Sequence, residues 1–468
     1  AHIVVVNHSL LMTDASQPGF LPDSNSVIVD EAHNLIKSAY DQFKIDWSEK
    51  DVLRILQTFD PSFSRSSRWN NMINRMGEKN SDIGELRDKL KDKVKDVQSN
   101  LKEFMELLTD DNHSRFTPTK PYQDKPILSN IENVFSHLNS EITSMKKGLE
   151  DIFSLFERLR KVILEIDRDR ENYPALHAVV ERGLEASTAL LGNLIKLTQD
   201  QDYEWVYWME GEYRNANTNK ERLIISLHAS LVDVSETLNT NFYNRFDHCL
   251  MTSATLKIDN TFNYFLKRMG LNDSKTVITK DFLSPFLYNE QVTYHQYGGS
   301  REISKEPEMI GDLVYYLHKT FSKRIMVLFT SIKALTDTSK YLSQKPGGRD
   351  LPLFAQVRGA SRPAIIKGMH QHPNGILFGT NSFWEGVDLP GDLLEILILV
   401  KLPFDVPTEP LVKSYSEYIN KIGGNSFMEY SLPEAAIRFR QGFGRLIRTT
   451  YDAGKFICLD NRIVVKRY

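Results

Sequence analysis

Two acidic residues and a histidine directly follow a short apolar run near the beginning of the sequence. The run Val27–Val29 has the β-branched composition of a buried strand, and Asp30, Glu31 and His33 lie just beyond it. Ligands of open parallel sheets bind outside the carboxyl ends of the strands. An aspartate there can hold Mg²⁺, usually through water, and an adjacent glutamate can polarise a water molecule that attacks a phosphate. The alternative is an acidic cap at the start of a helix.

A second group of candidate residues lies near the end of the sequence, in the segment Gln441–Arg448. Arg445 and Arg448 are three positions apart, so on a helix they project from one face. Two guanidinium groups on one face can neutralise the charge that develops on a transferring phosphoryl group. Gln441 on the same helix would reach the same phosphate. The alternatives are a surface ion-pair cluster for the arginines and an exposed position for the glutamine.

Two further loops each follow an apolar run. Thr252–Thr255 carries hydroxyl groups that could link a nucleotide site to a neighbouring domain, although alone it is typical of a turn. Gly379–Asp388 begins with a glycine and contains the aromatic pair Phe383 and Trp384. Aromatic rings stack on unpaired bases, and glycines let the backbone approach phosphate. The alternative for the two rings is a hydrophobic anchor that holds the loop to the core.

Short apolar runs, each bounded by polar or turn residues, are the elements that must position these groups. Helical stretches lie between the runs, and this alternation predicts parallel strands with helices on both faces of the sheet. The sequence therefore predicts an α/β fold. The predicted strands are Ile3–Val6, Val27–Val29, Cys249–Met251, Ile325–Phe329, Ile376–Phe378, Leu394–Val400 and Phe456–Leu459.

The long stretch between the second and third of these strands has helical periodicity. Its apolar residues advance by threes and fours, as a buried helix face requires, whereas charged residues fill the other faces. This pattern predicts an antiparallel helical bundle standing out from the α/β core, with solvated charged faces rather than a DNA track. One such apolar face comprises Ile83, Leu86, Leu90, Val94, Val97, Leu101, Phe104 and Leu108.

Length and composition limit the class of protein. The 468 residues are enough for several domains, and 41% hydrophobic and 25% charged residues are typical of a folded globular protein. The formal net charge of −3 gives no overall basic signature, so any nucleic-acid groove must be local.

The cysteine count and the hydropathy narrow the class further. The sequence contains 2 cysteines, which excludes a disulfide framework and a four-thiolate iron–sulfur site within it, and favours a reducing, cytoplasmic location. Cys249 and Cys458 lie in apolar runs and are predicted to be buried core thiols. No apolar run approaches the roughly 20 residues that span a bilayer, so we expect no membrane association.

Taken in order, the segments VIVDEAHNL, TSATL, VLFTS, GTNSFWEGVDLPG and QGFGRLIR resemble the DinG/XPD-like branch of superfamily 2 helicases. The resemblance covers the whole chain, including AHIVVVNHSLL at the start and the Leu283–Phe286 segment. It implies two RecA-like motor domains that close on ATP and Mg²⁺ and move along single-stranded DNA, typically 5′ to 3′. It implies no particular protein partner.

The resemblance also implies a division of the chain into domains. Residues 1–37 and 222–282 would form part of the first RecA-like domain, and residues 283–468 would form the second. Residues 38–221 would form a helical insertion, in the position that the family calls the Arch domain.

The resemblance implies roles for individual residues through their places in the matching motifs. Asp30 would hold Mg²⁺, Glu31 would activate water, and His33 would couple the nucleotide state to DNA. The residues implied to face the γ-phosphate are Gln441, Arg445 and Arg448. Those implied to line the nucleotide cleft are Glu385, Gly386 and Asp388. The candidate contacts with the DNA strand are Thr330, Ser331, Asn381 and Phe383.

The sequence departs from the family pattern in one important respect. The phosphate-binding loop GxxxxGK[ST], whose backbone N–H groups and lysine hold the phosphates of the nucleotide, is absent. The family places this loop upstream of the Asn7-His8 segment. We therefore expect the chain to be the C-terminal part of a longer protein and to be unable to hydrolyse ATP productively alone. Members with an iron–sulfur cluster place its four cysteines just before the equivalent of Ala1. The sequence therefore does not determine whether the longer protein carries a cluster.

Two other functions have to be weighed. Some bacterial DinG-like proteins lack the cluster and carry an N-terminal 3′–5′ exonuclease domain, and the helicase-like part then acts as a nucleotide-responsive regulator. In that case the chain would bind nucleotide and single-stranded DNA without unwinding. An RNA-directed DEAH helicase is disfavoured because Gln441–Arg448 differs from the corresponding pattern of that group.

Overall fold

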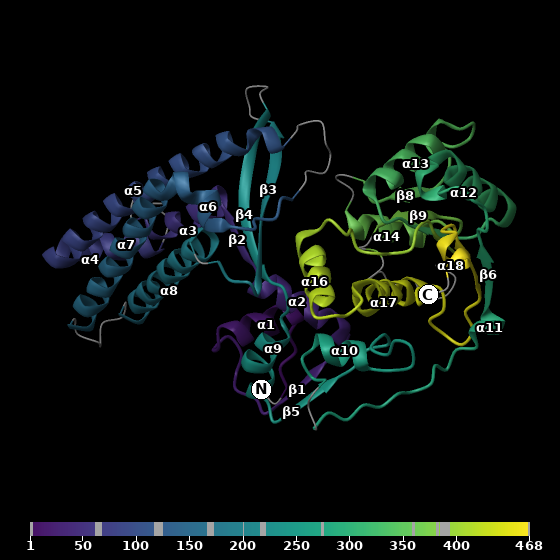
Figure 1. Ribbon diagram of the computed structural model, residues 1–468, viewed down its shortest axis with the longest axis horizontal. Helices are drawn as coiled ribbons and strands as arrows, with labels where there is room; N and C mark the ends of the chain where they lie inside the picture. The colour runs from purple at the N-terminus through teal and green to yellow at the C-terminus, as the bar shows by residue number, and fades with distance from the viewer. Residues whose placement is uncertain are drawn as a thin grey trace. The chain divides into compact units, whose positions relative to one another are not determined.

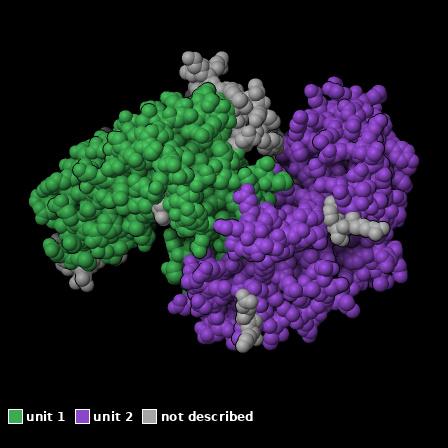
Figure 2. Space-filling view, viewed as in Figure 1, with its two compact units in different colours: residues 1–22, 37–234, 407–415 green, residues 23–36, 235–406, 416–468 purple. Residues whose placement is uncertain are grey.

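A computed structural model describes residues 3–60, 68–116, 125–165, 173–199, 201–215, 221–272, 276–357, 361–380, 383 and 394–466. The chain folds into two compact units, which Figure 2 distinguishes by colour. Unit 1 comprises residues 1–22, 37–234 and 407–415, and unit 2 comprises residues 23–36, 235–406 and 416–468. Among the described residues, no helix is both long enough and apolar enough to cross a membrane.

Most of unit 1 is a bundle of helices, as the periodicity predicts. In α5 (Ser81–Asn112) every residue of the predicted apolar face is buried. The helix begins at Asn80, whose side chain accepts hydrogen bonds from the backbone N–H groups of Asp82 and Ile83. Helix α5 packs against α7 (Asn139–Glu165), and α7 packs against α8 (Tyr173–Thr198), as Figure 1 shows. The other helices that lie wholly in unit 1 are α1 (His8–Ser16), α3 (Glu49–Phe59), α4 (Arg68–Lys79) and α6 (Ile131–Phe135).

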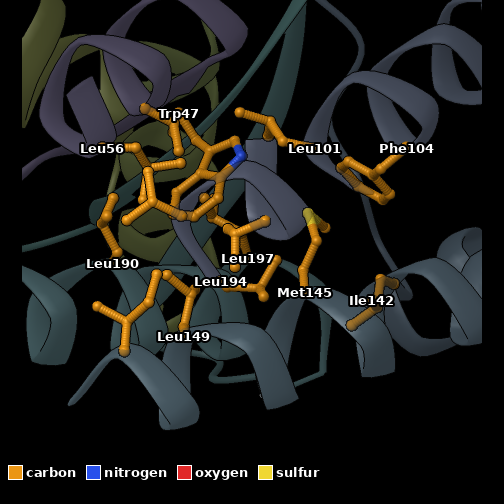
Figure 3. Packing of buried hydrophobic residues seen from close by; sticks show 14 of the residues in the cluster. Trp47, Leu56, Leu101, Phe104, Ile142, Met145, Leu149, Leu190, Leu194 and Leu197 are labelled. Carbon is orange, nitrogen blue, oxygen red and sulfur yellow. The ribbon is translucent and has the colours of Figure 1, made fainter. Parts of the chain in front are cut away.

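The core of the bundle is closely packed. Figure 3 shows Trp47 among leucines from several helices, including Leu56, Leu101 and Leu149. A glycine permits one close approach, because a Cβ atom on Gly183 of α8 would lie 2.5 Å from the ring of Phe156. The face predicted from spacing is therefore the face on which the bundle depends for its stability.

Replacing Leu101 by alanine tests this packing. Leu101 is 0% exposed, so we expect Leu101→Ala to lower the free energy of unfolding of the bundle by about 3 kcal/mol, because a cavity replaces the lost methyl groups. Leu107 of the same helix is 39% exposed, and Leu107→Ala is the matched control, with an expected change of less than about 0.5 kcal/mol. Denaturant unfolding measures both values. Equal losses for the two variants would contradict the buried register of α5.

Unit 1 also contains an antiparallel sheet, which the sequence did not predict. Strand β4 (Glu221–Leu231) lies between β2 (Ile45–Ser48) and β3 (Trp205–Asn215), as seen in Figure 1. The predicted helical insertion, residues 38–221, thus also contains β2 and β3, which its helical periodicity did not reveal. The predicted domain boundary between residues 221 and 222 falls at the start of β4, which pairs along its length with β3.

One face of this sheet is apolar and packs into the bundle core through Leu223, Ile225, Leu227 and Ala229. The opposite face carries a chain of polar contacts. Nδ1 of His228 lies 2.6 Å from Oδ1 of Asp46, and its Nε2 lies 2.8 Å from Oγ of Ser226. The ring of Trp208 stacks on His228 with centroids 5.3 Å apart. Alternation along the strands therefore separates a packed face from a hydrogen-bonded one.

The Asp46 carboxylate should make unit 1 sensitive to acid. Burial alone would raise the pKa of Asp46, but hydrogen bonds from His228 and Lys44 lower it to about 2. Because the folded pKa lies below the unfolded value, the stabilisation is present above about pH 4 and is lost as pH falls from 4 towards 2. Allowing for the half-exposed carboxylate, we expect this change to be about 1 kcal/mol. Unfolding at pH 5 and pH 3 should show it in the native protein and not in Asp46→Asn, whereas an identical pH dependence in both would contradict the assignment.

Unit 2 contains a two-stranded parallel sheet that brings together distant parts of the sequence. Strand β1 (Ser26–Val29) pairs with β5 (His248–Met251) in the register Val29↔Met251. Ile28 is 72% exposed and Leu250 is 57% exposed, so one face of these strands is open to solvent. Cys249 is exposed as well, so its predicted burial is wrong, whereas Cys458 is buried as predicted. Because successive side chains of a strand point to opposite faces, the exposure of Cys249 beside Leu250 shows that both faces of β5 are accessible to solvent.

The prediction of a strand at Ile3–Val6 is also wrong. These residues have no regular secondary structure, and Ile3 and Val5 are 83% and 91% exposed. The apolar β-branched composition matches a strand, but in the structure these residues pair with none of the described strands. A strand forms only where a neighbouring strand supplies hydrogen-bonding partners.

The second sheet of unit 2 has six parallel strands in the order β6-β11-β10-β7-β9-β8. It confirms the predicted strands at β7 (Ile325–Leu328), β9 (Ile376–Gly379), β10 (Ile396–Leu399) and β11 (Gly454–Cys458). The edge strands β6 (Val292–Gln296) and β8 (Leu353–Ala355) were not predicted.

Apolar side chains cover both faces of this sheet. Met326 and Leu328 belong to one buried cluster, and their neighbours Ile325 and Val327 belong to another. Burial on both faces is the reason that these strands read as continuous apolar runs. The helices connected to the sheet are α12 (Pro307–Phe321), α13 (Ile332–Gln344), α14 (Arg362–Gln371), α16 (Pro410–Lys421), α17 (Leu432–Phe443) and α18 (Arg462–Val465). The remaining described α-helices are α2 (Leu35–Phe43), α9 (Ser235–Asn241), α10 (Asn263–Arg268) and α11 (Tyr288–Gln291).

Candidate nucleotide site

The parallel pairing of β1 and β5 brings two of the predicted loops together. Each loop begins at the carboxyl end of its strand, and the backbone continues the ladder for one step beyond Val29. The N–H of Thr252 donates to the carbonyl of Val29 at 2.9 Å, and the N–H of Ala32 donates to the carbonyl of Thr252 at 2.9 Å. The side chains of Asp30, Glu31 and His33 therefore meet those of Thr252 and Ser253.

Asp30 is held by two hydrogen bonds to one carboxylate oxygen. The Thr252 hydroxyl donates to Oδ1 at 2.9 Å, and the N–H of Glu31 donates to the same atom at 2.9 Å. The residue is nevertheless exposed. A carboxylate fixed in one rotamer and open to solvent suits a Mg²⁺ ion, which commonly keeps several waters and takes one or two protein carboxylates together with phosphate oxygens.

The Ser253 hydroxyl connects Glu31 with His33. It lies 3.2 Å from Oε2 of Glu31 and 2.7 Å from Nδ1 of His33. The hydroxyl has one proton, so when it donates to the carboxylate it must accept from His33, which places a proton on Nδ1. The His33 side chain is 9% exposed, whereas that of Glu31 is 59% exposed. The buried histidine thus orients, through a serine, a carboxylate that faces solvent.

Glu31 adopts an unusual backbone conformation. Its φ of 48° and ψ of 46° are left-handed, and in most non-glycine residues this conformation costs roughly 1–2 kcal/mol. The conformation turns the chain sharply between β1 and the short 3₁₀ turn Ala32–Asn34. Strain of this kind persists where the surrounding hydrogen bonds fix the backbone, as they do here on both sides of the residue.

The donor set around Asp30 is compatible with a magnesium ion that keeps water ligands, and it does not form a closed protein cage among the described residues. In the part of the chain that the structure describes, no group of three or more histidine, cysteine, aspartate or glutamate side chains could hold a metal ion. Asp30 with water and phosphate ligands is compatible with Mg²⁺, which would neutralise charge on a phosphate. Zinc in a structural site would require four protein ligands.

The second predicted group, Gln441–Arg448, is only partly helical. Helix α17 ends at Phe443, and Arg445 and Arg448 lie in the turn that follows it. The expectation that both arginines project from one helix face is therefore wrong. Two glycines, Gly442 and Gly444, lower the helix propensity by about 1 kcal/mol each. The hydrogen bonds change to i→i−3 spacing, as in the N–H of Arg445 to the carbonyl of Gly442.

The surroundings of this turn are partly buried. Burial lowers the pKa of Arg448, and the negative charge of the nearby Asp452 carboxylate partly offsets this decrease. The Asp452 carboxylate accepts hydrogen bonds from the backbone N–H groups of Arg448 and Thr449 at 2.7 and 2.8 Å, which fixes the turn. Oε1 of Gln441 is buried and makes no hydrogen bond within the described residues. A buried amide oxygen without a hydrogen-bond partner in this segment is compatible with a polar ligand.

Helix α17 also contacts the segment that follows Ser253. The Arg440 guanidinium donates to the carbonyl of Lys257, and the Tyr264 hydroxyl donates to Glu434. In the helical turn Phe427–Ser431, which directly precedes α17, Glu429 accepts from Lys267 at 2.8 Å. All these residues belong to unit 2. The helix that carries Gln441 is therefore joined by direct hydrogen bonds to the segment that carries Ser253.

Thr330 and Ser331 lie at the carboxyl end of β7. Ser331 caps α13 by accepting a hydrogen bond from the N–H of Ala334 at 3.4 Å. Phe383 is 1% exposed and packs in the core of the sheet, so burial favours its alternative role as a loop anchor over a contact with a base. Asn381, Glu385, Gly386 and Asp388 lie outside the described residues.

From the sequence, Thr252 and Ser253 were expected only to link a nucleotide site to a neighbouring domain. Their hydrogen bonds to Asp30, Glu31 and His33 were not anticipated. The available signal was that both hydroxyls directly follow an apolar run, as the acidic pair does. Pairing of those two runs in one sheet was the missing information.

Comparisons with known proteins show which families and folds the chain is similar to. Residues 314–468 match the family described as Helicase C-terminal domain. The whole chain is 29% identical to "3'-5' exonuclease DinG" of Bacillus subtilis, covering 50% of that protein, and 24% identical to "ATP-dependent DNA helicase DinG" of Escherichia coli, covering 65% of it. The chain thus spans about half to two thirds of the length of these relatives.

A solved structure named XPD_APO shares the fold. It matches 97% of this chain and 77% of its own chain, with a TM-score of 0.51 and 14% sequence identity. The α/β architecture with parallel sheets is therefore similar to that of this structure. The family match, the relatives and the shared fold together support a similarity of the chain to the DinG/XPD-like branch of superfamily 2 helicases.

Proposed function

We propose that this chain is the C-terminal part of an ATP-dependent DNA helicase that moves 5′ to 3′ along single-stranded DNA in the cytoplasm. The observation that supports the proposal best is the hydrogen-bonded cluster of Asp30, Glu31, His33, Thr252 and Ser253 at the end of a parallel strand pair. This cluster holds one carboxylate for Mg²⁺ and a second, solvent-facing carboxylate for a water molecule.

The proposed reaction is attack of water on the γ-phosphate of ATP. Glu31 orients that water, and Asp30 holds the Mg²⁺ that offsets charge on the phosphates. His33 senses the position of Glu31 through Ser253 and relays it to DNA binding. Gln441, Arg445 and Arg448 face the γ-phosphate, and the two guanidinium groups stabilise the charge on the transferring group. Glu385, Gly386 and Asp388 line the same nucleotide cleft.

The proposed substrate is a single DNA strand. Thr330, Ser331 and Asn381 would contact it at the carboxyl edge of the six-stranded sheet, where ligands of such sheets bind. The proposed organisation assigns residues 1–37 and 222–282 to the first motor domain, 38–221 to the insertion and 283–468 to the second motor domain.

We further propose that productive hydrolysis requires a phosphate-binding loop supplied by a longer polypeptide. The sequence contains no GxxxxGK[ST] pattern, and the chain spans 50% and 65% of the first two relatives. Without that loop, the backbone N–H groups and lysine that hold the nucleotide phosphates are missing.

A second candidate function is nucleotide-regulated exonuclease activity. It is favoured by one observation, the name "3'-5' exonuclease DinG" of the B. subtilis relative. In this case the chain would grip single strands and bind ATP without unwinding, and a separate domain would cleave DNA.

One preparation distinguishes the two candidates. The longest natural polypeptide that contains this chain is assayed for DNA-stimulated ATP hydrolysis, for unwinding of forked DNA and for degradation of single strands, with and without ATP. Unwinding that depends on ATP supports the helicase. Degradation that ATP suppresses, with no unwinding, contradicts the helicase and supports the regulated nuclease.

A further inference from the structure

A cavity of about 290 Å³ lies at the carboxyl ends of β6, β10 and β11. It is lined by the loops that follow these strands, namely residues 300–304, 400–401 and 459–462. Its volume is close to the lower limit of about 300 Å³ for pockets that bind small molecules. In open parallel sheets this edge is where ligands bind. None of its lining residues belongs to the candidate nucleotide site described above.

Each of the three loops contributes one cation to the cavity. These are Arg301 after β6, Lys401 after β10 and Arg462 after β11. The side chains of Lys401 and Arg462 are 37% and 35% exposed, and Arg301 is also exposed. In the described part of the chain, Arg301 makes no ion pair. Three cations that converge from separate loops onto one cavity indicate an anionic ligand.

The cavity is preformed because hydrogen bonds join the loops to one another. Asp460, whose side chain is 7% exposed, accepts from the N–H of Leu402 at 2.9 Å and from the Arg462 guanidinium at 2.6 Å. Asn461 donates to the carbonyl of Gly299 at 2.8 Å. The three loops are therefore fixed relative to one another without a ligand, which lowers the ordering cost of binding.

Glu302 is the one carboxylate of the cavity whose side chain is substantially exposed, at 49%. It pairs with Lys401 at 3.1 Å and with Lys305 at 2.7 Å. These hydrogen bonds lower the pKa of Glu302 to about 2, so it is a carboxylate at neutral pH. An anion that enters the cavity must compete with this carboxylate for Lys401. Removal of its charge should consequently strengthen the binding of an anion.

The position of the cavity identifies the anion. In the sheet order, β10 lies directly beside β7, whose carboxyl end carries Thr330 and Ser331. The cavity and these candidate DNA contacts therefore share one edge of one sheet. We propose that the cavity binds backbone phosphates of the same single DNA strand, next to the segment held by Thr330 and Ser331. This inference rests on the proposed function and extends its substrate site to β6, β10 and β11.

Binding of fluorescent oligothymidylates to the chain tests the proposal by anisotropy at several salt concentrations. We expect the double variant Arg301→Ala, Lys401→Gln to bind a 15-nucleotide strand about tenfold more weakly. Its logarithmic salt slope should be smaller by about 1.4, because roughly 0.7 is lost for each phosphate contact on a single strand. The matched control is Arg349→Ala, an exposed arginine in the loop that precedes β8, at the amino edge of the sheet, for which we expect no change.

Glu302→Gln separates this proposal from simple misfolding. We expect it to bind the strand about threefold more tightly, an outcome that a damaged fold would not produce. A double variant and a Glu302→Gln variant that bind like the native chain would overturn the inference and leave the proposed function standing. A native chain that binds no single strand would contradict both. The inference also fails if the double variant loses affinity for thymidine monophosphate or polyglutamate while its affinity for the strand is unchanged.

Discussion

Glu31→Gln is expected to reduce ATP turnover by a factor of about 10² to 10⁴, the range over which positioned acid–base groups act. The variant keeps an oxygen that can accept the Ser253 hydrogen bond 3.2 Å away, so the local structure should persist. It loses the charge that polarises water. The measurement is DNA-stimulated phosphate release by the longest natural polypeptide that contains the chain, with nucleotide affinity measured in parallel.

The control for this variant is Glu308→Gln. Glu308 is an exposed carboxylate in the first turn of α12, outside the candidate nucleotide site. It should leave turnover unchanged. If Glu31→Gln retained turnover within about threefold of the native protein while binding nucleotide normally, Glu31 would not be the water-activating residue.

Arg448→Ala is expected to have the second large effect. Guanidinium groups that stabilise the transferring phosphoryl group contribute about 10³ to 10⁵ in turnover, so hydrolysis should fall close to background. DNA binding should be retained. The turn itself should survive, because Asp452 accepts hydrogen bonds from the backbone N–H groups of residues 448 and 449, which alanine keeps.

Arg448→Lys supplies the matched comparison. Lysine keeps the charge but not the planar fork of five donors, so its turnover should lie between those of alanine and arginine. Thermal unfolding of both variants checks that the half-buried position tolerates the change. Native turnover in a folded Arg448→Ala protein would remove this residue from the site.

The fold could be predicted where burial is extreme. Strands β7, β9 and β10 are buried along their whole length, so their apolar residues are contiguous in the sequence. Edge strand β6 is buried only at Val292. Its polar residues Thr293 and His295 interrupt the apolar pattern, so the strand could not be recognised in the sequence. Conversely, Ile3–Val6 has the apolar composition of a buried strand, but Ile3, Val4 and Val5 are exposed and pair with none of the described strands. Composition therefore predicts central, fully buried strands, whereas edge strands and unpaired apolar segments depend on tertiary context.

The candidate site could be predicted in its residue types but not in its connections. Asp30 and Glu31 were recognisable because they follow an apolar run. The hydrogen bonds that Thr252 makes to Asp30 and Ser253 makes to Glu31 depend on the pairing of β1 with β5. The two strands are more than two hundred positions apart in the sequence, and local patterns contain no information on such pairing. The end of α17 at Phe443 was missed because a three-residue spacing of arginines is compatible with both a helix and a turn.

At Glu31 the stability of the backbone and the presence of a carboxylate favour different residues. Glycine would adopt the same φ of 48° without steric strain, so Glu31→Gly relieves the backbone while it removes the carboxylate. A laboratory selection for heat resistance alone would therefore be drawn towards loss of this side chain. Under the proposed function, a lineage that still needs hydrolysis must retain the strained glutamate. A lineage that only binds DNA in a nucleotide-dependent way could replace Glu31 without loss of function. The residue found at this position in each descendant would therefore show whether that descendant has kept hydrolysis or only nucleotide-dependent DNA binding.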